Sequence, residues 1–262
     1  TLTFQGLDLN VSSANMTNWE NVVLDGGSMV FSDGMVTVGS DAGTGLFLEN
    51  AAVLDASTGP LSIVGNLTNN AILTMQDGIT GDTTSVSGDY SGTGELLVDV
   101  DFTGDVSDTM TVGGDLTGGS TTIDFNDVST GDATGNDVLV VDVAGATAAG
   151  DFVQSGEILA GPFLYNLNLM GGGWYLQSSL LPQVEAYAPT LTIMQDMGRD
   201  FIGNLWERVG HRETGFGPNG SSTEGSGVWG RAHGKLLQAD SGATSSGASF
   251  ECAHGFLQAG VD

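Results

Sequence analysis

The feature that most constrains the fold is a pattern that recurs along the first half of the chain. Four segments begin at Gly39, Gly65, Gly88 and Gly114, at spacings of 26, 23 and 26 residues. Each has a glycine, then Ser, Asn or Asp, then a turn, then an apolar strand: GSDAGTGLFLE, GNLTNNAILTM, GDYSGTGELLV and GDLTGGSTTID. A period of about 20 to 30 residues with one apolar strand per unit is typical of a parallel β-solenoid, whose coils bury their inward side chains by stacking.

The rest of residues 1–130 fits this interpretation. Short strands are predicted at 22–24, 36–38, 46–48, 61–64, 72–75, 96–100 and 121–125, separated by Gly, Asn, Asp and Ser. No window of about a dozen residues keeps a helical period. We therefore predict an all-β fold in which residues 1–130 form solenoid turns with their aspartates projecting outward. A β-sandwich with evenly spaced strands is the alternative.

Residues 131–181 have a different character, because aromatic side chains become frequent. Apolar runs lie at 138–141, 163–165, 167–169 and 174–176, and the last two are separated by three glycines. Aromatic packing across strands would close the open end of a solenoid, whose exposed edge otherwise invites aggregation. We predict a capping segment, with Tyr165, Trp174, Tyr175 and Leu176 as its characteristic residues.

Residues 182–227 are predicted to be a linker that contains a helix at about 189–210. Pro189 suits the first turn of a helix, and apolar residues recur at helical spacing from Leu191 to Leu205. About 20 helical residues span roughly 30 Å, close to the thickness of a bilayer core. The charged residues Arg199 and Arg208 are incompatible with lipid contact. The helix could therefore lie inside a pore.

Residues 228–262 alternate in the manner of transmembrane barrel strands. One face of 228–236 presents Arg231, His233 and Lys235, together with a tryptophan, and the other face presents small or apolar residues. We predict that the basic face lines a barrel lumen and that 249–261 is a second strand. Two strands cannot close a barrel, so a truncated barrel is expected.

Charge divides the chain sharply. There are 32 acidic residues and five basic ones, and residues 1–198 contain 25 of the acids and no Lys or Arg. The bases are Arg199, Arg208, Arg212, Arg231 and Lys235. A charge of −25 on the first region argues against nucleic acid or anionic lipid as its partner. The acids are interpreted as a soluble surface coat, with calcium binding as the alternative.

The catalytic possibilities are few. All three histidines (His211, His233, His254) and the single thiol, Cys252, follow residue 210. Residues 1–210 therefore cannot form a Ser-His-Asp, a Cys-His or a common zinc site, and no disulfide within the chain is possible. The alternative that survives is a carboxylate-only glycan hydrolase, for which the densest candidates are Asp99, Asp101, Asp105 and Asp108. We interpret these as solvated turns, and no catalytic residue, cofactor or metal site is assigned.

Five short motifs occur in one order: 172–176 (GGWYL), the proline-containing linker, 205–210 (LWERVG), 228–231 (VWGR) and 255–262 (GFLQAGVD). Together they resemble the junction between passenger and barrel in type V autotransporters with pertactin-like passengers. The resemblance implies a right-handed parallel β-helix, an autochaperone segment at 131–181, a helix threading an outer-membrane β-barrel, contact with outer-membrane lipid, and the barrel assembly machinery as a partner.

The function that follows is secretion and display. We expect a self-secreted, non-enzymatic stalk on the surface of a Gram-negative bacterium, with an adhesin or virulence role and a host or cell-surface receptor as a candidate partner. The sequence opens in mid-pattern, so a fragment of a longer protein is expected. The alternatives are a β-helical polysaccharide hydrolase that uses paired aspartates and a calcium-binding repeat module.

Overall fold

The computed structural model describes residues 1–187, 189–202, 228–239 and 249–261, and it divides the chain into two compact units. The first unit is Thr1–Leu180 and the second is Leu181–Asp262. Among the described helices, none is both long and apolar enough to cross a membrane.

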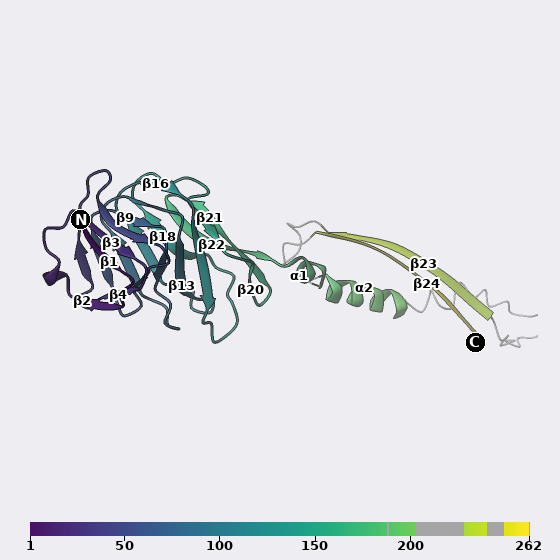
Figure 1. Cartoon of the computed structure of the whole chain (residues 1–262). Helices are drawn as coiled ribbons and strands as arrows, with labels where there is room; N and C mark the ends of the chain where they lie inside the picture. The colour runs from purple at the N-terminus through teal and green to yellow at the C-terminus, as the bar shows by residue number, and fades with distance from the viewer. Residues whose placement is uncertain (188, 203–227, 240–248, 262) are drawn as a thin grey trace, which may run out of the picture. The chain divides into compact units, whose positions relative to one another are not determined.

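The first unit is a parallel β-solenoid built from three sheets, whose strands stack turn upon turn (Figure 1). The first sheet contains β1 (Leu2–Gln5), β3 (Asn21–Asp25), β6 (Gly45–Glu49), β9 (Leu67–Asn69), β12 (Tyr90–Gly92) and β16 (Leu116–Gly119). The second contains β2 (Leu9–Val11), β4 (Ser28–Phe31), β7 (Val53–Asp55), β10 (Ile72–Thr74), β13 (Glu95–Asp101), β17 (Thr121–Asp127) and β19 (Phe152–Gln154).

The third sheet begins parallel and ends antiparallel. Its parallel part is β5 (Met35–Thr37), β8 (Leu61–Val64), β11 (Thr83–Val86), β15 (Thr109–Val112) and β18 (Val138–Val143). Its antiparallel part is β22 (Gly173–Leu180), β21 (Phe163–Met170) and β20 (Ile158–Ala160). The short elements η1 (Ser13–Asn15) and β14 (Val106–Ser107) lie outside this order. In this fully described unit, each complete turn contributes one strand to every sheet, which makes about five turns.

Columns of apolar side chains explain why these short segments form strands. In the parallel register, one inward position of each sheet lies directly above its equivalent in the next turn. The columns are Val22, Leu46, Leu67 and Tyr90; Met29, Leu54, Leu73, Leu96 and Ile123; and Val36, Ile63, Val86, Val112 and Val143. Each of these side chains is at most 4% exposed. Burial of each contributes about 1.5 to 3 kcal/mol, but only when a neighbouring turn covers it.

The recurring glycine occupies one corner of every turn. The backbone N–H groups of Gly88 and Gly114 donate to the carbonyl oxygens of Gly65 and Gly88 in the preceding turns, each at 2.9 Å. A Cβ atom on Gly88 would stand 2.8 Å from the Gly65 carbonyl oxygen, so no larger residue fits. The spacing of these glycines in the sequence is therefore the length of one turn.

The residues after Gly65, Gly88 and Gly114 form what we call the Asx ladder, namely Asn66, Asp89 and Asp115. Its side-chain oxygens accept backbone N–H bonds from the next turn. Asn66 Oδ1 accepts from Asp89 at 2.9 Å, Asp89 Oδ1 from Asp115 at 2.9 Å, and Asp115 Oδ1 from Ala146 at 2.7 Å. The Asn or Asp of the last three repeats thus satisfies a backbone donor as well as contributing to the surface.

The predicted parallel solenoid is confirmed, with two corrections. The repeat predicts one apolar strand per unit, whereas each turn has three, because strands of three or four residues are too short to show a clear alternation. The aspartates were all expected to project outward, but Asp99 and Asp108 are fully buried.

The second unit contains two helices and two strands. Helix α1 (Pro182–Tyr187) begins at a proline within the predicted linker, and α2 (Thr190–Ile202) begins directly after Pro189. The strands β23 (Val228–Ala239) and β24 (Phe250–Val261) pair antiparallel along their whole length. Residues 203–210 of the predicted helix and the loop 211–227 lie outside the described residues. The barrel itself stays a prediction.

Candidate functional site

The candidate site of the first unit is the end of the solenoid, where strand β18 pairs in two ways. On one side it continues the parallel stack, with Val112 opposite Val143. On the other side it pairs antiparallel with β22, with Val138 opposite Leu176 and Val141 opposite Trp174. Strand β22 forms a hairpin with β21 through Gly171 and Gly172, so the predicted capping segment covers an edge that would otherwise stay open.

Two aromatic contacts join this hairpin to the solenoid core, and two more extend them. The rings of Tyr165 and Phe102 have centroids 4.2 Å apart, and Trp174 packs edge-on against Phe152 at 5.4 Å. Phe152 also stacks on Tyr90 at 5.7 Å. Tyr165 has a second aromatic neighbour, at 6.3 Å, in Phe163. The first three pairs connect segments from different turns, whereas the last lies within β21. Such contacts contribute about 0.5 to 1.5 kcal/mol each beyond the area they bury.

The polar atoms of the buried rings have partners. Trp174 Nε1 donates to Thr147 Oγ1 at 3.1 Å, and the Tyr165 hydroxyl accepts the backbone N–H of Gly135 at 3.2 Å. Burial raises the pKa of Tyr165, so this hydroxyl stays neutral. Because neither ring leaves a polar group unsatisfied, the aromatic contacts carry no desolvation penalty that would offset them.

The four predicted cap residues divide into two groups. Tyr165, Trp174 and Leu176 are at most 3% exposed and point into the core. Tyr175 is half-buried on the opposite face of β22, where its ring covers Gly173. Sequence analysis did not identify Phe102, Phe152 or Tyr90 as part of the cap. Each is a large aromatic residue among smaller ones in an apolar pattern, and this difference in size is the signal that could have revealed them.

The buried carboxylates Asp99 and Asp108 form a second arrangement in this unit. Asp99 Oδ2 accepts the backbone N–H groups of Asp77 and Gly78 at 2.8 and 2.7 Å, and its Oδ1 accepts the Asn126 amide at 2.5 Å. Asp108 Oδ1 accepts from Gly81 and Asp82, and its Oδ2 accepts the backbone N–H of Asp99 at 2.8 Å. Together they hold the segment 77–82 against β13.

Burial and the crowding of carboxylates here shift the pKa values of Asp108 and Asp82. Burial raises the pKa of Asp108. Burial, and then the charges of Asp108 and other carboxylates, raises the pKa of Asp82 to about 6. Asp101 and Asp105 differ, since both lie nearer the surface and accept hydrogen bonds from nearby turns. The four predicted acids therefore do not supply the open pair of carboxylates that a hydrolase would need. The two buried ones already accept several N–H bonds each.

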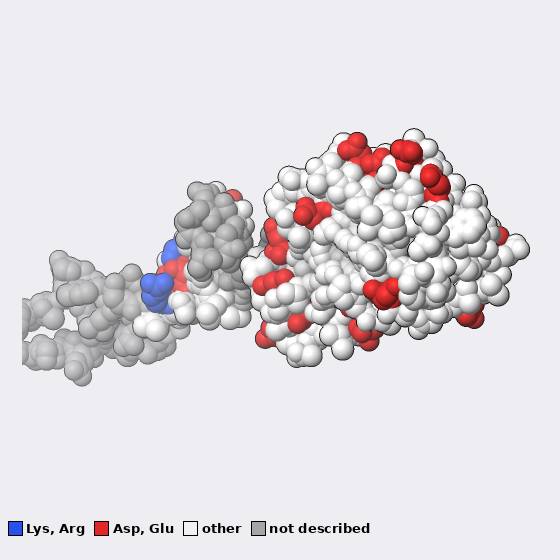
Figure 2. All heavy atoms as spheres, turned by 90° about the vertical axis from the view of Figure 1, so that its left-hand side faces the viewer, with Lys and Arg blue, Asp and Glu red and all other residues white. Residues whose placement is uncertain are grey.

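On the face that Figure 2 shows, the acidic side chains of this unit lie in separate groups with uncharged surface between them. Some of them accept hydrogen bonds across turns. Asp33 accepts the backbone N–H and the hydroxyl of Ser13 at 2.8 Å each, which lowers its pKa to about 2.

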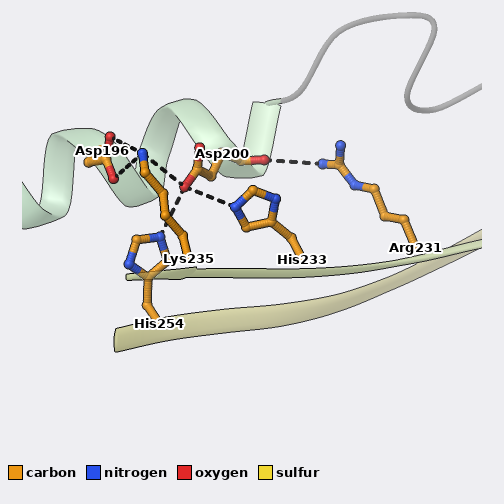
Figure 3. A network of polar contacts seen from close by, with 6 residues as sticks. All are labelled: Asp196, Asp200, Arg231, His233, Lys235 and His254. Atoms are coloured by element: carbon orange, nitrogen blue, oxygen red, sulfur yellow. Dashed lines mark hydrogen bonds and ion pairs between the residues drawn. The ribbon is translucent and has the colours of Figure 1, made fainter. Parts of the chain in front are cut away.

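In the second unit, α2 turns its acidic face toward the strands (Figure 3). Lys235 Nζ pairs with Asp196 at 2.6 Å, and His254 Nε2 lies 2.9 Å from Asp200 Oδ2. Arg231 donates to Gln258 at 2.6 Å and to the backbone oxygen of Asp200 at 3.4 Å.

The predicted lumen residues Arg231, His233 and Lys235 thus share the strand face that contacts α2. Arg199 is exposed, and Arg208 lies outside the described residues. The apolar residues Leu191, Met194 and Ile202 of α2 are 64 to 81% exposed, so this contact is made by charge rather than by the apolar stripe.

Comparison with known proteins agrees with this architecture. A family model described as Autochaperone Domain Type 1 matches residues 62–167, from β8 into β21. It therefore covers solenoid turns as well as part of the capping segment.

Three relatives also match. The chain is 33% identical over 162 residues to the probable autotransporter YfaL of Escherichia coli (strain K12), covering 58% of this chain and 13% of that protein. It is 28% identical to the uncharacterized protein YuaQ of the same strain, covering 72% of this chain and 15% of that protein. It is 27% identical to the adhesin BmaC autotransporter of Brucella suis biovar 1 (strain 1330), covering 76% of this chain and 6% of that protein.

Among solved structures, the Haemophilus influenzae Hap adhesin matches 61% of this chain and 18% of that chain at 22% identity, with a TM-score of 0.45. The chain thus spans less than a fifth of the length of each of these proteins. The autochaperone match and the autotransporter relatives, together with the parallel solenoid, support a passenger region of a type V autotransporter, and these relatives imply a place at the cell surface and outer membrane of a Gram-negative bacterium.

Proposed function

We propose that residues 131–181 act as an autochaperone cap from which the solenoid of residues 1–130 folds, and that this folding promotes translocation of the passenger. The observation that carries the proposal is the double pairing of β18, which presents a finished parallel edge to the solenoid while the β21–β22 hairpin covers its other side.

The cap has the features of a segment that folds early. Its hairpin is closed by two residues, Gly171 and Gly172, with φ of 62° and 93°. Positive φ at both positions suits the tight turn that matches the twist of antiparallel strands. Hairpins of this kind form in about 1 to 10 μs, whereas the solenoid strands pair only with residues a full turn away.

Stacking then has a direction. Once β18 is in place, β15 can pair with it, and each further turn buries its apolar column on the turn already formed. Folding from this end would draw the remaining chain outward. The absence of Lys, Arg and Cys from residues 1–198 supports this proposal, because such a segment cannot form disulfides or Lys/Arg salt bridges inside a pore.

For the second unit we propose the start of an outer-membrane β-barrel with α2 in its lumen. The small or apolar residues Gly230, Ala232, Gly234 and Leu236 are exposed on one face of β23, where lipid contact would suit them. The opposite face carries the charges that pair with α2. The barrel assembly machinery would then be a partner during insertion.

For the displayed passenger we propose a non-enzymatic adhesive stalk, with a possible host or cell-surface receptor and a role in virulence. One relative is named an adhesin, which supports this choice. The hydrolase alternative is weakened by Asp99 and Asp108, whose oxygens are occupied by backbone and amide donors. The calcium alternative is weakened in the same way at these two positions.

The test compares refolding rates of full-chain variants diluted from urea. Trp174→Ala should cost about 3 to 5 kcal/mol and slow folding roughly thirtyfold, because its contacts would form in the transition state. Leu46→Ala, in a fully buried position of an early turn, is the matched control and should mainly accelerate unfolding. If Leu46→Ala slowed folding as much as Trp174→Ala, the cap would have no special place in the folding order.

A further inference from the structure

Three possible metal ligands converge in the second unit from three different elements. Asp200 lies in the last turn of α2, His233 in the middle of β23, and His254 in β24 (Figure 3). His254 Nε2 is 2.9 Å and His233 Nε2 is 3.3 Å from the same oxygen, Asp200 Oδ2. One ligand atom from each residue can be chosen so that all three lie within 4.8 Å of one another.

Two imidazole nitrogens in this cluster lack a hydrogen-bond partner among the described residues. His233 Nε2 is buried without one, although 38% of its side chain is exposed, and it is aimed at Asp200. The His254 side chain is 7% exposed, and its Nδ1 has no partner either. Buried polar atoms normally have partners. A buried nitrogen that faces a carboxylate and a second imidazole without a good hydrogen bond is a position where a metal ion would satisfy all three groups.

We propose that Asp200 Oδ2, His233 Nε2 and His254 Nε2 bind one divalent transition-metal ion of the zinc class, with water in the remaining position. Two imidazoles and a carboxylate suit zinc and its neighbours, whereas Ca²⁺ and Mg²⁺ prefer all-oxygen sites. Tetrahedral bonds of about 2.0 to 2.1 Å place ligand atoms about 3.3 Å apart. The two measured separations are close to that value, and rotation of the half-exposed His233 ring can bring the third into range.

The surroundings leave Asp200 available for the ion. Lys235 Nζ is 3.8 Å from Asp200 Oδ2 but is held by both oxygens of Asp196 at 2.6 and 2.7 Å. The ammonium charge is therefore already paired by another carboxylate. Arg231 donates to the backbone oxygen of Asp200, which helps to fix the end of α2 over the strands. A bound ion would link α2 to both strands at once, whereas the hydrogen bond from His254 links Asp200 to β24 alone.

The test is titration of the full chain with Zn²⁺ by calorimetry and with Co²⁺ by visible absorption. We expect one equivalent per chain and the intense bands of a four-coordinate cobalt centre. His233→Ala, His254→Ala and Asp200→Asn should each weaken binding by at least about tenfold. His211→Ala is the matched control, since it removes the one other histidine and should leave affinity unchanged.

Far-UV circular dichroism of each variant establishes that the chain is still folded. Histidine-to-glutamine variants at positions 233 and 254 provide a second, less disruptive pair if the alanine variants lose structure. Binding that is weaker than about 1 mM, or equal losses for His211→Ala and His254→Ala, would overturn the proposal. The result is independent of the cap, because none of these variants touches residues 1–180.

Discussion

Replacing Asp108 with alanine tests whether the buried carboxylates are structural. The side chain is fully buried and accepts three backbone N–H bonds, from Gly81, Asp82 and Asp99. Asp108→Ala removes the acceptor without removing the donors, which is the costly way to break a hydrogen bond.

The magnitude follows from where the donors lie. The N–H of Asp99 is buried, so losing its partner costs about 1 to 3 kcal/mol. The N–H groups of Gly81 and Asp82 are closer to the surface, where water can replace part of the loss. Removing the carboxylate also relieves its repulsion with Asp82. The balance is a net loss of about 2 to 4 kcal/mol, or a fall of roughly 1 M in the urea midpoint.

Urea denaturation followed by far-UV circular dichroism measures this change. Asp101→Ala is the matched control, since Asp101 accepts one N–H, from Thr103 at 2.8 Å, in a surface turn. It should cost no more than about 1 kcal/mol. Equal stability of the two variants would refute the structural role of Asp108. Polysaccharide hydrolysis that Asp108→Ala abolishes while its stability stays unchanged would revive the hydrolase alternative.

Two further predictions concern charge and backbone spacing. The pKa of Asp82 rises from 3.8 to about 6 on folding, so its contribution to stability is fully present below pH 3.8 and is lost as the pH rises through 6. The urea midpoint should therefore be higher at about pH 4.5 than at about pH 7. Asp82→Asn should raise the midpoint at neutral pH and reduce this difference. An unchanged pH profile in the variant would contradict the raised pKa of Asp82. Gly88→Ala should cost about 1 to 3 kcal/mol, because the new Cβ would press on the Gly65 carbonyl oxygen. Gly156→Ala, whose Cβ would meet nothing within 4 Å, should be nearly neutral, and thermal melting of the two variants would show whether close backbone stacking sets the repeat.

The solenoid could be predicted because its determinants repeat. A glycine at one corner of the turn and one strong apolar strand per turn recur at a spacing that few folds share, so a single sequence reveals the period. The other two strands of each turn are short and mixed in composition. They form because strands in adjacent turns pair with them. Their partners lie a full turn away along the chain, so a local sequence pattern does not show them.

The buried carboxylates could not be predicted for a similar reason. Asp99 and Asp108 stand in the same run as the surface residues Asp101 and Asp105, and nothing local distinguishes them. Only the path of segment 77–82 decides which carboxylates it covers. The convergence of Asp200, His233 and His254 was equally hidden, since it depends on which face of α2 meets the strands. Apolar periodicity suggested the opposite face.

The Asx ladder has a consequence for how such a surface can change. Asn66, Asp89 and Asp115 accept the equivalent backbone N–H of successive turns, one through an amide oxygen and two through carboxylates. The fold requires a hydrogen-bond acceptor at these positions and does not require a charge. The surface charge of the passenger is therefore separable from its architecture. The Asx ladder could be changed from Asp to Asn one turn at a time, and the solenoid would keep its shape while its surface became less negative.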